Sequence, residues 1–356
     1  MALTILIVAL SVAAGAVCLY LLLGAFVFSQ TLSRNATKRG MNTLPDEYAL
    51  LGKDGASKKQ EQQNLWGRIL ERLLGAAAGL DNFYEKPYYF SFFEGLQWFF
   101  ANNPQKVTIE SPRNGETLHA DVFVNPKPSD IWFICIHGYC SSPRDFGGAA
   151  KIYHDDWGYN VLLPYLGAHG RSEGKYVSMG WLDRIDITAW IDYIIREYGK
   201  NIKIILHGVS MGAGTTMMTT GEALPPNVIC AVADCGYTSF WDEYALQAKV
   251  TLKQPAFPGV YALNTFVRWR MGFSMKEASC VEQLKKSKTP TLFIHGDADD
   301  FVPFDMLDPN YEACAAEKEK LTVPGAGHAE ASYHPSYYSA IKKFLDQYLQ
   351  KEPVLR

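Results

Sequence analysis

A serine between two glycines is the feature of this sequence that most directly predicts chemistry. The stretch Gly208-Val209-Ser210-Met211-Gly212 follows an apolar run at 202–207 and leads into small residues at 211–215. A strand, the pattern G-x-S-x-G and a helix, in that order, make a sharp turn that exposes the serine hydroxyl at its tip. The glycines are required because the strand and the helix pass closely there. We therefore expect Ser210 to be a nucleophile rather than an ordinary helix N-cap.

A serine hydroxyl needs a base within hydrogen-bond reach, and the base needs a carboxylate that orients it. Asp299 follows the apolar run 291–296, and His328 follows the run 321–323. Residues just past the carboxyl ends of parallel strands gather at one edge of a sheet. Ser210, Asp299 and His328 can therefore meet, although they are distant in sequence. Alternatives remain open for both partners: Asp234, Asp297 and Asp300 for the acid, and His334 for the base.

Two backbone N–H groups are needed to stabilise the oxyanion of an acyl-transfer intermediate. The first is expected from Met211, directly after the serine, and the second from Tyr139, in the loop that begins His137-Gly138. Cys140, beside that loop, is expected to be inert. His137, His207 and His295 are expected to brace strand ends, and His169 to make a loop hydrogen bond.

No metal and no organic cofactor are expected. The acidic cluster at 297–300 lacks the pattern of a calcium loop, since Phe301 and Val302 stand where ligand and glycine positions are needed. The cysteines and histidines show no zinc-ligand spacing.

The elements that must position these residues alternate along the chain from about residue 105. A hairpin with Asn114-Gly115 at its turn comes first. Further strands are expected at 131–136, 160–163, 202–207, 228–233, 291–294 and 320–323, with helices at 143–156, 181–198, after Ser210 and at 333–349. The helix at 181–198 is expected to face inward through Ile185, Ala189, Ile191, Ile194 and Ile195. Continuous apolar strands with helical crossovers indicate an α/β fold with a mostly parallel, doubly wound sheet.

Two segments are candidates for covering the site. Residues 64–104 are unusually aromatic, which fits either a surface touching lipid or helices packed on the main domain; we favour packing. Residues 237–288 interrupt the alternation with about 50 residues, which is typical of a small helical lid.

The N-terminus is expected to be a single transmembrane anchor, 1–28, followed by a polar tether, 29–63. Residues 3–28 are mostly apolar and carry no charge, and at ~1.5 Å per residue they exceed the ~30 Å hydrocarbon core of a bilayer. No basic residue precedes the run, which argues against a cleaved signal peptide. Arg34, Lys38 and Arg39 follow the span, so the catalytic domain is expected to face the cytoplasm. The odd cysteine number, seven, agrees with that side.

Composition limits the remaining partners. The formal net charge is −3, and without a basic excess no nucleic-acid partner is expected. The oligomeric state is not predicted.

Together, His137-Gly138, Gly208-x-Ser210-x-Gly212, His295-Gly296-x-x-Asp299 and Gly325-Ala326-Gly327-His328 resemble the α/β-hydrolase family, over about 107–349. The likeness is strongest to bacterial esterases and prolyl-oligopeptidase-like peptidases. It implies an α/β-hydrolase domain at 105–351, with Asp299 as the triad acid and His328 as the base. The family's Asp-x-Arg-Gly-x-Gly stretch is replaced here by residues 165–172, which lack the Asp–Arg pair.

The expected activity is that of a membrane-tethered serine hydrolase of ester, thioester or amide acyl groups, most simply a carboxylesterase acting on a small or lipid-like acyl substrate. Alternatives are an acyl-protein thioesterase or a serine peptidase at the membrane. A non-catalytic membrane scaffold built on the same fold is an alternative of another class.

Overall fold

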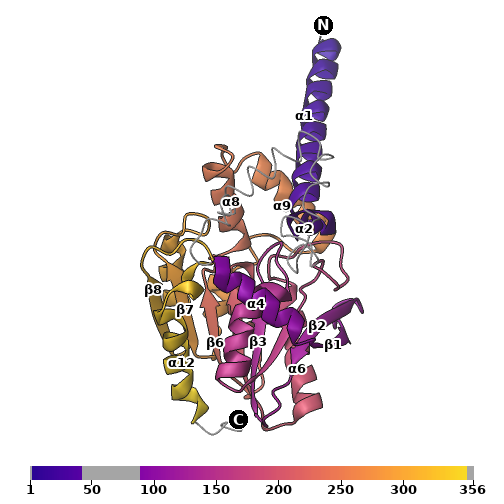
Figure 1. The fold of residues 1–356 in the computed structure, drawn as a ribbon. Coiled ribbons are helices and arrows are strands. Elements are labelled where there is room, and N and C mark those ends of the chain that lie inside the picture. Colours follow the sequence, from indigo (N-terminus) through magenta and orange to yellow (C-terminus); the bar gives the residue numbers. More distant parts are fainter. Residues whose placement is uncertain (1, 42–88, 351–356) are drawn as a thin grey trace, which may run out of the picture.

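The computed structural model describes residues 2–41 and 89–350, and an eight-stranded sheet forms its centre (Figure 1). The strand order is β1-β2-β4-β3-β5-β6-β7-β8. β1 pairs antiparallel with β2 and β2 antiparallel with β4, while all later pairings are parallel. The strands are β1 (Gln105–Glu110), β2 (Thr117–Phe123), β3 (Ile131–Ile136), β4 (Asn160–Pro164), β5 (Lys203–Val209), β6 (Val228–Asp234), β7 (Thr291–Gly296) and β8 (Lys318–Val323).

Helices cover both faces of the sheet, because the central strands are apolar on both sides. In β3, Ile134 and Ile136 belong to one core, whereas Phe133 and Cys135 belong to the other. The first core is packed by α6 (Asp183–Tyr198), α7 (Met211–Thr220), α10 (Cys280–Leu284) and α11 (Leu307–Ala313). The second is packed by α4 (Tyr89–Ala101), α5 (Gly147–Lys151) and α12 (Ser336–Leu349). The fold is the expected mostly parallel α/β sheet.

Two expected helices differ in detail. The helix expected at 143–156 is divided into a 3-10 turn (Pro143–Phe146), α5 and a π-helical turn (Ile152–Asp156). In α6 the buried face carries Ile187, Trp190, Ile191 and Ile194, together with two aspartates; Ile185, Ala189 and Ile195 are only half-buried. The face is rotated because Asp183 and Asp186 have buried hydrogen-bond partners, which hydropathy alone does not reveal. Two further 3-10 turns lie at Phe304–Met306 and Ala331–Tyr333.

Between β6 and β7 the chain leaves the sheet and forms α8 (Phe240–Val250), α9 (Gly259–Met271) and α10. In Figure 1, α8 and α9 lie on the same side of the sheet as the N-terminal helix. The described part of the aromatic segment, α4, packs against α5, where a Cβ on Gly95 would lie 2.3 Å from the backbone of Gly148. Trp98 and Phe99 are buried there, so this part packs on the domain. Residues 64–88 of that segment lie outside the described residues.

The N-terminal helix α1 (Ala2–Thr31) is followed by α2 (Arg34–Met41). The expected tether at 29–63 is wrong for its first residues, which are docked on the domain. Leu32 is fully buried and its carbonyl accepts a hydrogen bond from the Val177 amide at 2.8 Å. The Arg34 guanidinium donates to the carbonyl oxygens of Gly170 and Ser172. The polar composition concealed this contact because polar side chains, Arg34 and Thr37, make part of it through hydrogen bonds to backbone carbonyls. Residues 42–63 lie outside the described part.

Candidate active site

The turn at Ser210 joins β5 to α7 with φ 58° and ψ −119°, a left-handed conformation that is strained for a serine. The Ser210 amide donates to the Asp234 carbonyl at 2.9 Å, which ties the turn to β6. A Cβ on Gly208 would lie 2.0 Å from the Gly212 carbonyl oxygen, so both glycines allow the strand and the helix to touch. The sequence therefore produces the exposed serine tip that nucleophilic attack requires.

Ser210, His328 and Asp299 meet beyond the carboxyl ends of three strands. His328 Nε2 lies 2.9 Å from Ser210 Oγ, and His328 Nδ1 lies 2.8 Å from Asp299 Oδ2. The other carboxylate oxygen, Oδ1, accepts backbone N–H groups of Phe301 and Val302, both at 3.0 Å. The Phe301 ring packs against the His328 ring with centroids 4.9 Å apart. The imidazole is thus held between a fixed carboxylate and the hydroxyl.

Asp299 is ionised under ordinary conditions. Burial opposes its charge, but hydrogen bonds from His295 and His328 outweigh burial and bring its pKa to about 2. An ionised Asp299 only accepts, so His328 Nδ1 carries the proton and Nε2 is the acceptor facing Ser210. This tautomer is the one that a general base needs.

The alternative partners are placed elsewhere. Asp234 is buried and accepts from the Tyr337 hydroxyl at 2.8 Å, and burial raises its pKa to about 6. Asp297 is exposed and accepts from the Gly325 amide, and Asp300 is exposed. His334 Nδ1 lies 2.8 Å from the Ser336 hydroxyl. Of the acids considered, only Asp299 has a hydrogen bond to His328 among the described contacts.

The loop after β3 lies against Ser210. A Cβ on Gly138 would lie 3.4 Å from Ser210 Cβ, which places the next residue, Tyr139, at the side of the serine. The Tyr139 hydroxyl donates to the Thr31 carbonyl at the end of α1. The Cys140 thiol lies 3.8 Å from the Ala36 carbonyl of α2. No pattern in the amino-acid sequence predicted this contact between the N-terminal helices and the loop.

The histidines that were expected to brace strand ends all have hydrogen-bond partners. His137 Nε2 accepts from the Leu166 amide at 3.1 Å, and burial lowers the pKa of His137 to about 3. His207 lies between Tyr153 and Tyr337, at 2.9 and 3.0 Å. His295 Nε2 lies 2.8 Å from the Val302 carbonyl and 3.3 Å from Asp299. His169 makes a loop contact to the Gly167 carbonyl at 2.9 Å. His295 therefore supports the Asp299 carboxylate, a contact that the sequence did not indicate.

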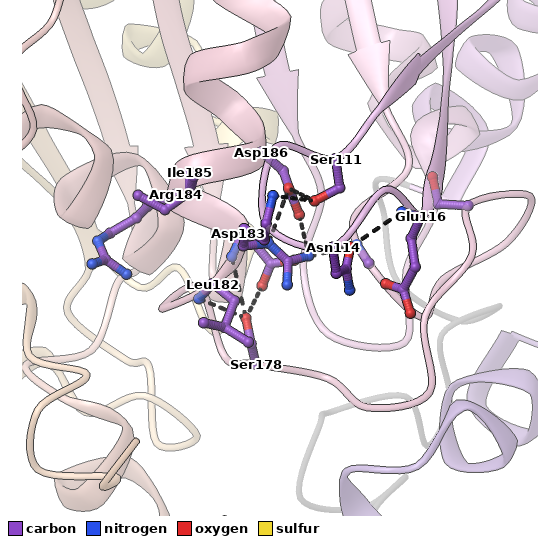
Figure 2. A network of polar contacts seen from close by, with 12 residues as sticks. Ser111, Asn114, Glu116, Ser178, Leu182, Asp183, Arg184, Ile185 and Asp186 are labelled. Carbon is purple, nitrogen blue, oxygen red and sulfur yellow. Dashed lines mark hydrogen bonds and ion pairs between the residues drawn. The ribbon is translucent and has the colours of Figure 1, made fainter. Parts of the chain in front are cut away.

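The loop at 165–172, which lacks the Asp–Arg pair, is supported by other carboxylates. Arg171 forms an ion pair with buried Asp121 on β2. Figure 2 shows a second network, in which Asp186 of α6 faces Ser111 near the β1–β2 turn and Asp183 faces Ser178. Asp183 accepts from the Gly167 amide at 3.2 Å and from the Ser178 hydroxyl (Figure 2). Asp186 forms an ion pair with Arg113 at 2.6 Å. These contacts replace the missing pair.

One group of potential metal ligands occurs among the described residues: Cys235, Asp299 and His328, with ligand atoms within 4.8 Å of one another. Asp299 and His328 are already engaged with each other and with Ser210, and Cys235 is buried. The arrangement fits proton transfer better than metal coordination.

Residues Ser11–Thr31 of α1 have the length and composition of a membrane-crossing helix, which a membrane anchor and a signal sequence share.

Comparison with known proteins places this chain among hydrolases. Residues 178–352 match the prolyl oligopeptidase family. The uncharacterized protein YqkD of Bacillus subtilis is 28% identical over 230 residues, covering 59% of this chain and 75% of that protein. The α/β-hydrolase domain-containing protein aho-3 of Caenorhabditis elegans is 29% identical over 189 residues, covering 52% of this chain and 49% of that protein.

Solved structures show the same fold. The esterase Pf2001 of Pyrococcus furiosus superposes with a TM-score of 0.56 and 25% identity, covering 70% of this chain and 94% of that one. The acylaminoacyl peptidase of Pyrococcus horikoshii superposes with a TM-score of 0.52 and 15% identity, covering 71% of this chain and 42% of that one. The shared architecture thus includes proteins named as esterases and as peptidases.

Proposed function

The chain is a member of the α/β-hydrolase family, and from that premise we propose that it is a serine hydrolase of acyl esters, thioesters or amides, with carboxylesters as its main substrates. The observation that carries the proposal is the continuous hydrogen-bonded chain from Ser210 through His328 to Asp299. The chemistry that this chain supports needs no metal or organic cofactor.

In the proposed reaction, His328 Nε2 takes the Ser210 proton as Oγ attacks the acyl carbon. The oxyanion lies against the backbone N–H groups of Met211 and Tyr139, each typically worth ~10²–10³ in rate. His328 then gives its proton to the leaving group, and an acyl-serine remains. Water, deprotonated by His328, attacks this ester; the acid is released and Ser210 regains its proton. Asp299 holds the imidazole and stabilises its protonated form throughout.

A serine peptidase or an acyl-protein thioesterase is the second candidate. The match to the prolyl oligopeptidase family at 178–352 favours the serine peptidase. The contact of α1 and α2 with the loop beside Ser210 favours the acyl-protein thioesterase, since this contact would place the site near a membrane. Rates on matched ester, thioester and peptide substrates distinguish them, and a thioesterase should prefer long acyl chains.

We also propose that α1 is a retained anchor and that the catalytic domain faces the cytoplasm. Arg34, Lys38 and Arg39 follow the apolar helix, and positive residues tend to stay on that side. The seven cysteines, all of which lie in the described residues, form no disulfide with one another, as in proteins of a reducing compartment.

The test is Ser210→Ala in the full chain. We expect loss of p-nitrophenyl ester turnover and of covalent labelling by a fluorophosphonate, because no other group would carry the acyl intermediate. Ser339→Ala, an exposed serine on α12, is the matched control and should retain both. Labelling that survives in Ser210→Ala would overturn the assignment. A folded wild type that is inert on broad ester and peptide panels would favour a scaffold.

A further inference from the structure

Large exposed apolar side chains are concentrated on two neighbouring parts of the described chain. Twelve such side chains are exposed: six on α1, five between Val250 and Trp269, and Val124. The five are Val250, Leu252, Phe257, Tyr261 and Trp269, the last two on α9. Trp269 and Phe257 are 68% and 63% exposed. An apolar patch of this kind on one side of a soluble domain indicates a contact surface.

The same region is mostly basic: exposed Asp242 and buried Glu243 lie at the start of α8, and only basic charges follow them up to residue 276. Residues 244–276 contain Lys249, Lys253, Arg268, Arg270 and Lys276 and no aspartate or glutamate. The Arg270 guanidinium lies 4.3 Å from the centre of the exposed Trp269 ring. Aromatic rings beside lysine and arginine are typical of the membrane–water interface, where anionic headgroups attract the cations. A protein partner is less favoured, since interfaces between proteins are depleted in lysine.

Helix α9 lies directly along α1 (Figure 1). The Tyr20 hydroxyl is 3.1 Å from Thr265 Oγ1, and the Phe28 and Phe266 rings are 6.2 Å apart. A Cβ on Gly24 would lie 2.7 Å from the Ala262 carbonyl oxygen, so the two backbones are in contact. α9 therefore lies beside α1 over residues 20–28.

The length of α1 sets the depth of that contact. Its 30 residues extend ~45 Å at ~1.5 Å each, which matches a bilayer of ~40–45 Å including both headgroup layers. If α1 spans the membrane, each headgroup layer takes up about five residues at an end of the helix, so residues 20–28 extend from the acyl chains into the headgroup layer on the domain side. α9 must then lie at the same depth.

We propose that α8 and α9, residues Phe240–Met271, form an interfacial arm that lies at the boundary between the headgroups and the acyl chains of the membrane anchored by α1, with preference for anionic lipids. The occupant of this surface is the lipid bilayer. Apolar tips at Phe257 and Trp269 enter the acyl boundary, while Arg268 and Arg270 meet headgroup phosphates.

The interfacial arm is joined to the catalytic residues. Gln247 on α8 donates to the Phe301 carbonyl at 2.7 Å, and the Phe301 ring packs on His328. On the proposed function, the site therefore opens beside the lipid surface, and its acyl substrates come from the membrane. This consequence rests on the proposed function, whereas the membrane contact itself does not.

The test of the contact uses the full chain in phospholipid vesicles with brominated acyl chains, which quench nearby tryptophans. Phe257→Trp adds an indole on the interfacial arm, and Val124→Trp adds one at the end of β2. Because β2 runs antiparallel to the catalytic strands, Val124 lies at the opposite edge of the sheet. Leu19→Trp, an exposed position on α1, reports insertion of the anchor.

We expect bromolipid to quench a larger fraction of the fluorescence in Phe257→Trp and Leu19→Trp than in the wild type, and a smaller fraction in Val124→Trp. Trp269→Phe should lower the quenched fraction. Quenching in Leu19→Trp with none added in Phe257→Trp would overturn the proposal and favour a second copy on this surface, which chemical cross-linking would reveal. Absence of quenching in Leu19→Trp would overturn the anchor and with it the proposal.

Lipid charge and substrate form supply two further readouts. In wild type, the quenched fraction should rise with anionic lipid, and R268Q/R270Q should abolish that rise. Phe257→Ser with Trp269→Ser should lower turnover of a vesicle-borne long-chain ester by about tenfold, since two apolar anchors are lost, with p-nitrophenyl acetate turnover within about twofold of wild type. An equal loss of turnover on the long-chain ester and on p-nitrophenyl acetate would overturn the inference that substrates reach the site from the membrane. If no ester is turned over at all, the proposed function fails, while the quenching result still stands.

Discussion

Asp299→Asn tests whether the carboxylate sets the proton position on His328. In wild type, Oδ1 accepts two backbone N–H groups and Oδ2 faces His328 Nδ1. Asparagine has one oxygen, and the two amides require it at the Oδ1 position. Its NH₂ group must then point at His328 Nδ1. The imidazole is driven to carry its proton on Nε2, where it can no longer accept the Ser210 proton.

The expected loss follows from this wrong tautomer. We expect kcat/KM to fall by about 10³–10⁴-fold, or about 4–5 kcal/mol, with KM little changed.

The free energy of unfolding of Asp299→Asn should also be lower than that of the wild type. A pKa lowered from 3.8 to about 2 corresponds to about 2 kcal/mol of stabilisation above pH 4, which is lost as the pH falls towards 2. The stability difference between wild type and Asp299→Asn should therefore shrink below pH 4.

The assay is p-nitrophenyl acetate hydrolysis with fluorophosphonate titration of active sites. Asp297→Asn and Asp300→Asn are matched controls, because both carboxylates are exposed and neighbour Asp299 in sequence. Both should retain wild-type rates within about threefold, since exposed carboxylates contribute little. More than a tenth of wild-type activity in Asp299→Asn would refute the reasoning, as would a greater loss in Asp234→Asn.

Three further predictions concern the support of the site. Gly212→Ala places a Cβ 1.8 Å from a carbonyl of β3 and should abolish folding or activity, whereas Gly148→Ala, with its nearest atom at 4.0 Å, should express and hydrolyse ester normally. Burial raises the pKa of Glu243 to about 8, so the stability of the wild type declines as the pH rises from 4.5 to 8. Glu243→Gln removes this buried charge. The melting temperature of Glu243→Gln should therefore exceed that of the wild type by more at pH 9 than at pH 5. Arg34→Met removes charge-assisted bonds to two carbonyls and should cost about 1.5–3 kcal/mol in detergent unfolding, against less than about 0.5 kcal/mol for exposed Lys38→Met.

The sequence predicted the parts of the site that depend on topology. Once 202–207 and 291–296 are assigned as buried parallel strands, the residues after them must emerge at one edge. Ser210 and Asp299 therefore approach each other whatever the intervening helices do. The glycines at 208 and 212 predicted the sharp turn for a steric reason that is local, and the backbone contacts show the same crowding.

The parts that the sequence did not predict depend on buried polar partners. Asp183 and Asp186 look like exposed positions of an amphipathic helix, but each has its own buried hydrogen-bond partners. A hydropathy scale treats burial of a carboxylate as unfavourable, because it contains no information on the hydrogen-bond partner that offsets the desolvation cost. The same limit concealed Arg34, whose charged side chain docks residues expected to be a tether.

The two halves of the site are held by different parts of the chain. Ser210, His328 and Asp299 are fixed by hydrogen bonds that begin at strand ends of the sheet. The loop with Tyr139 instead contacts carbonyls at the end of α1 and in α2. Those N-terminal residues are in turn fixed by Leu32 in the core and by Arg34 on the loop at 170–172. Residues 31–37 are therefore structural parts of the α/β domain, and they contact the loop that lies beside Ser210.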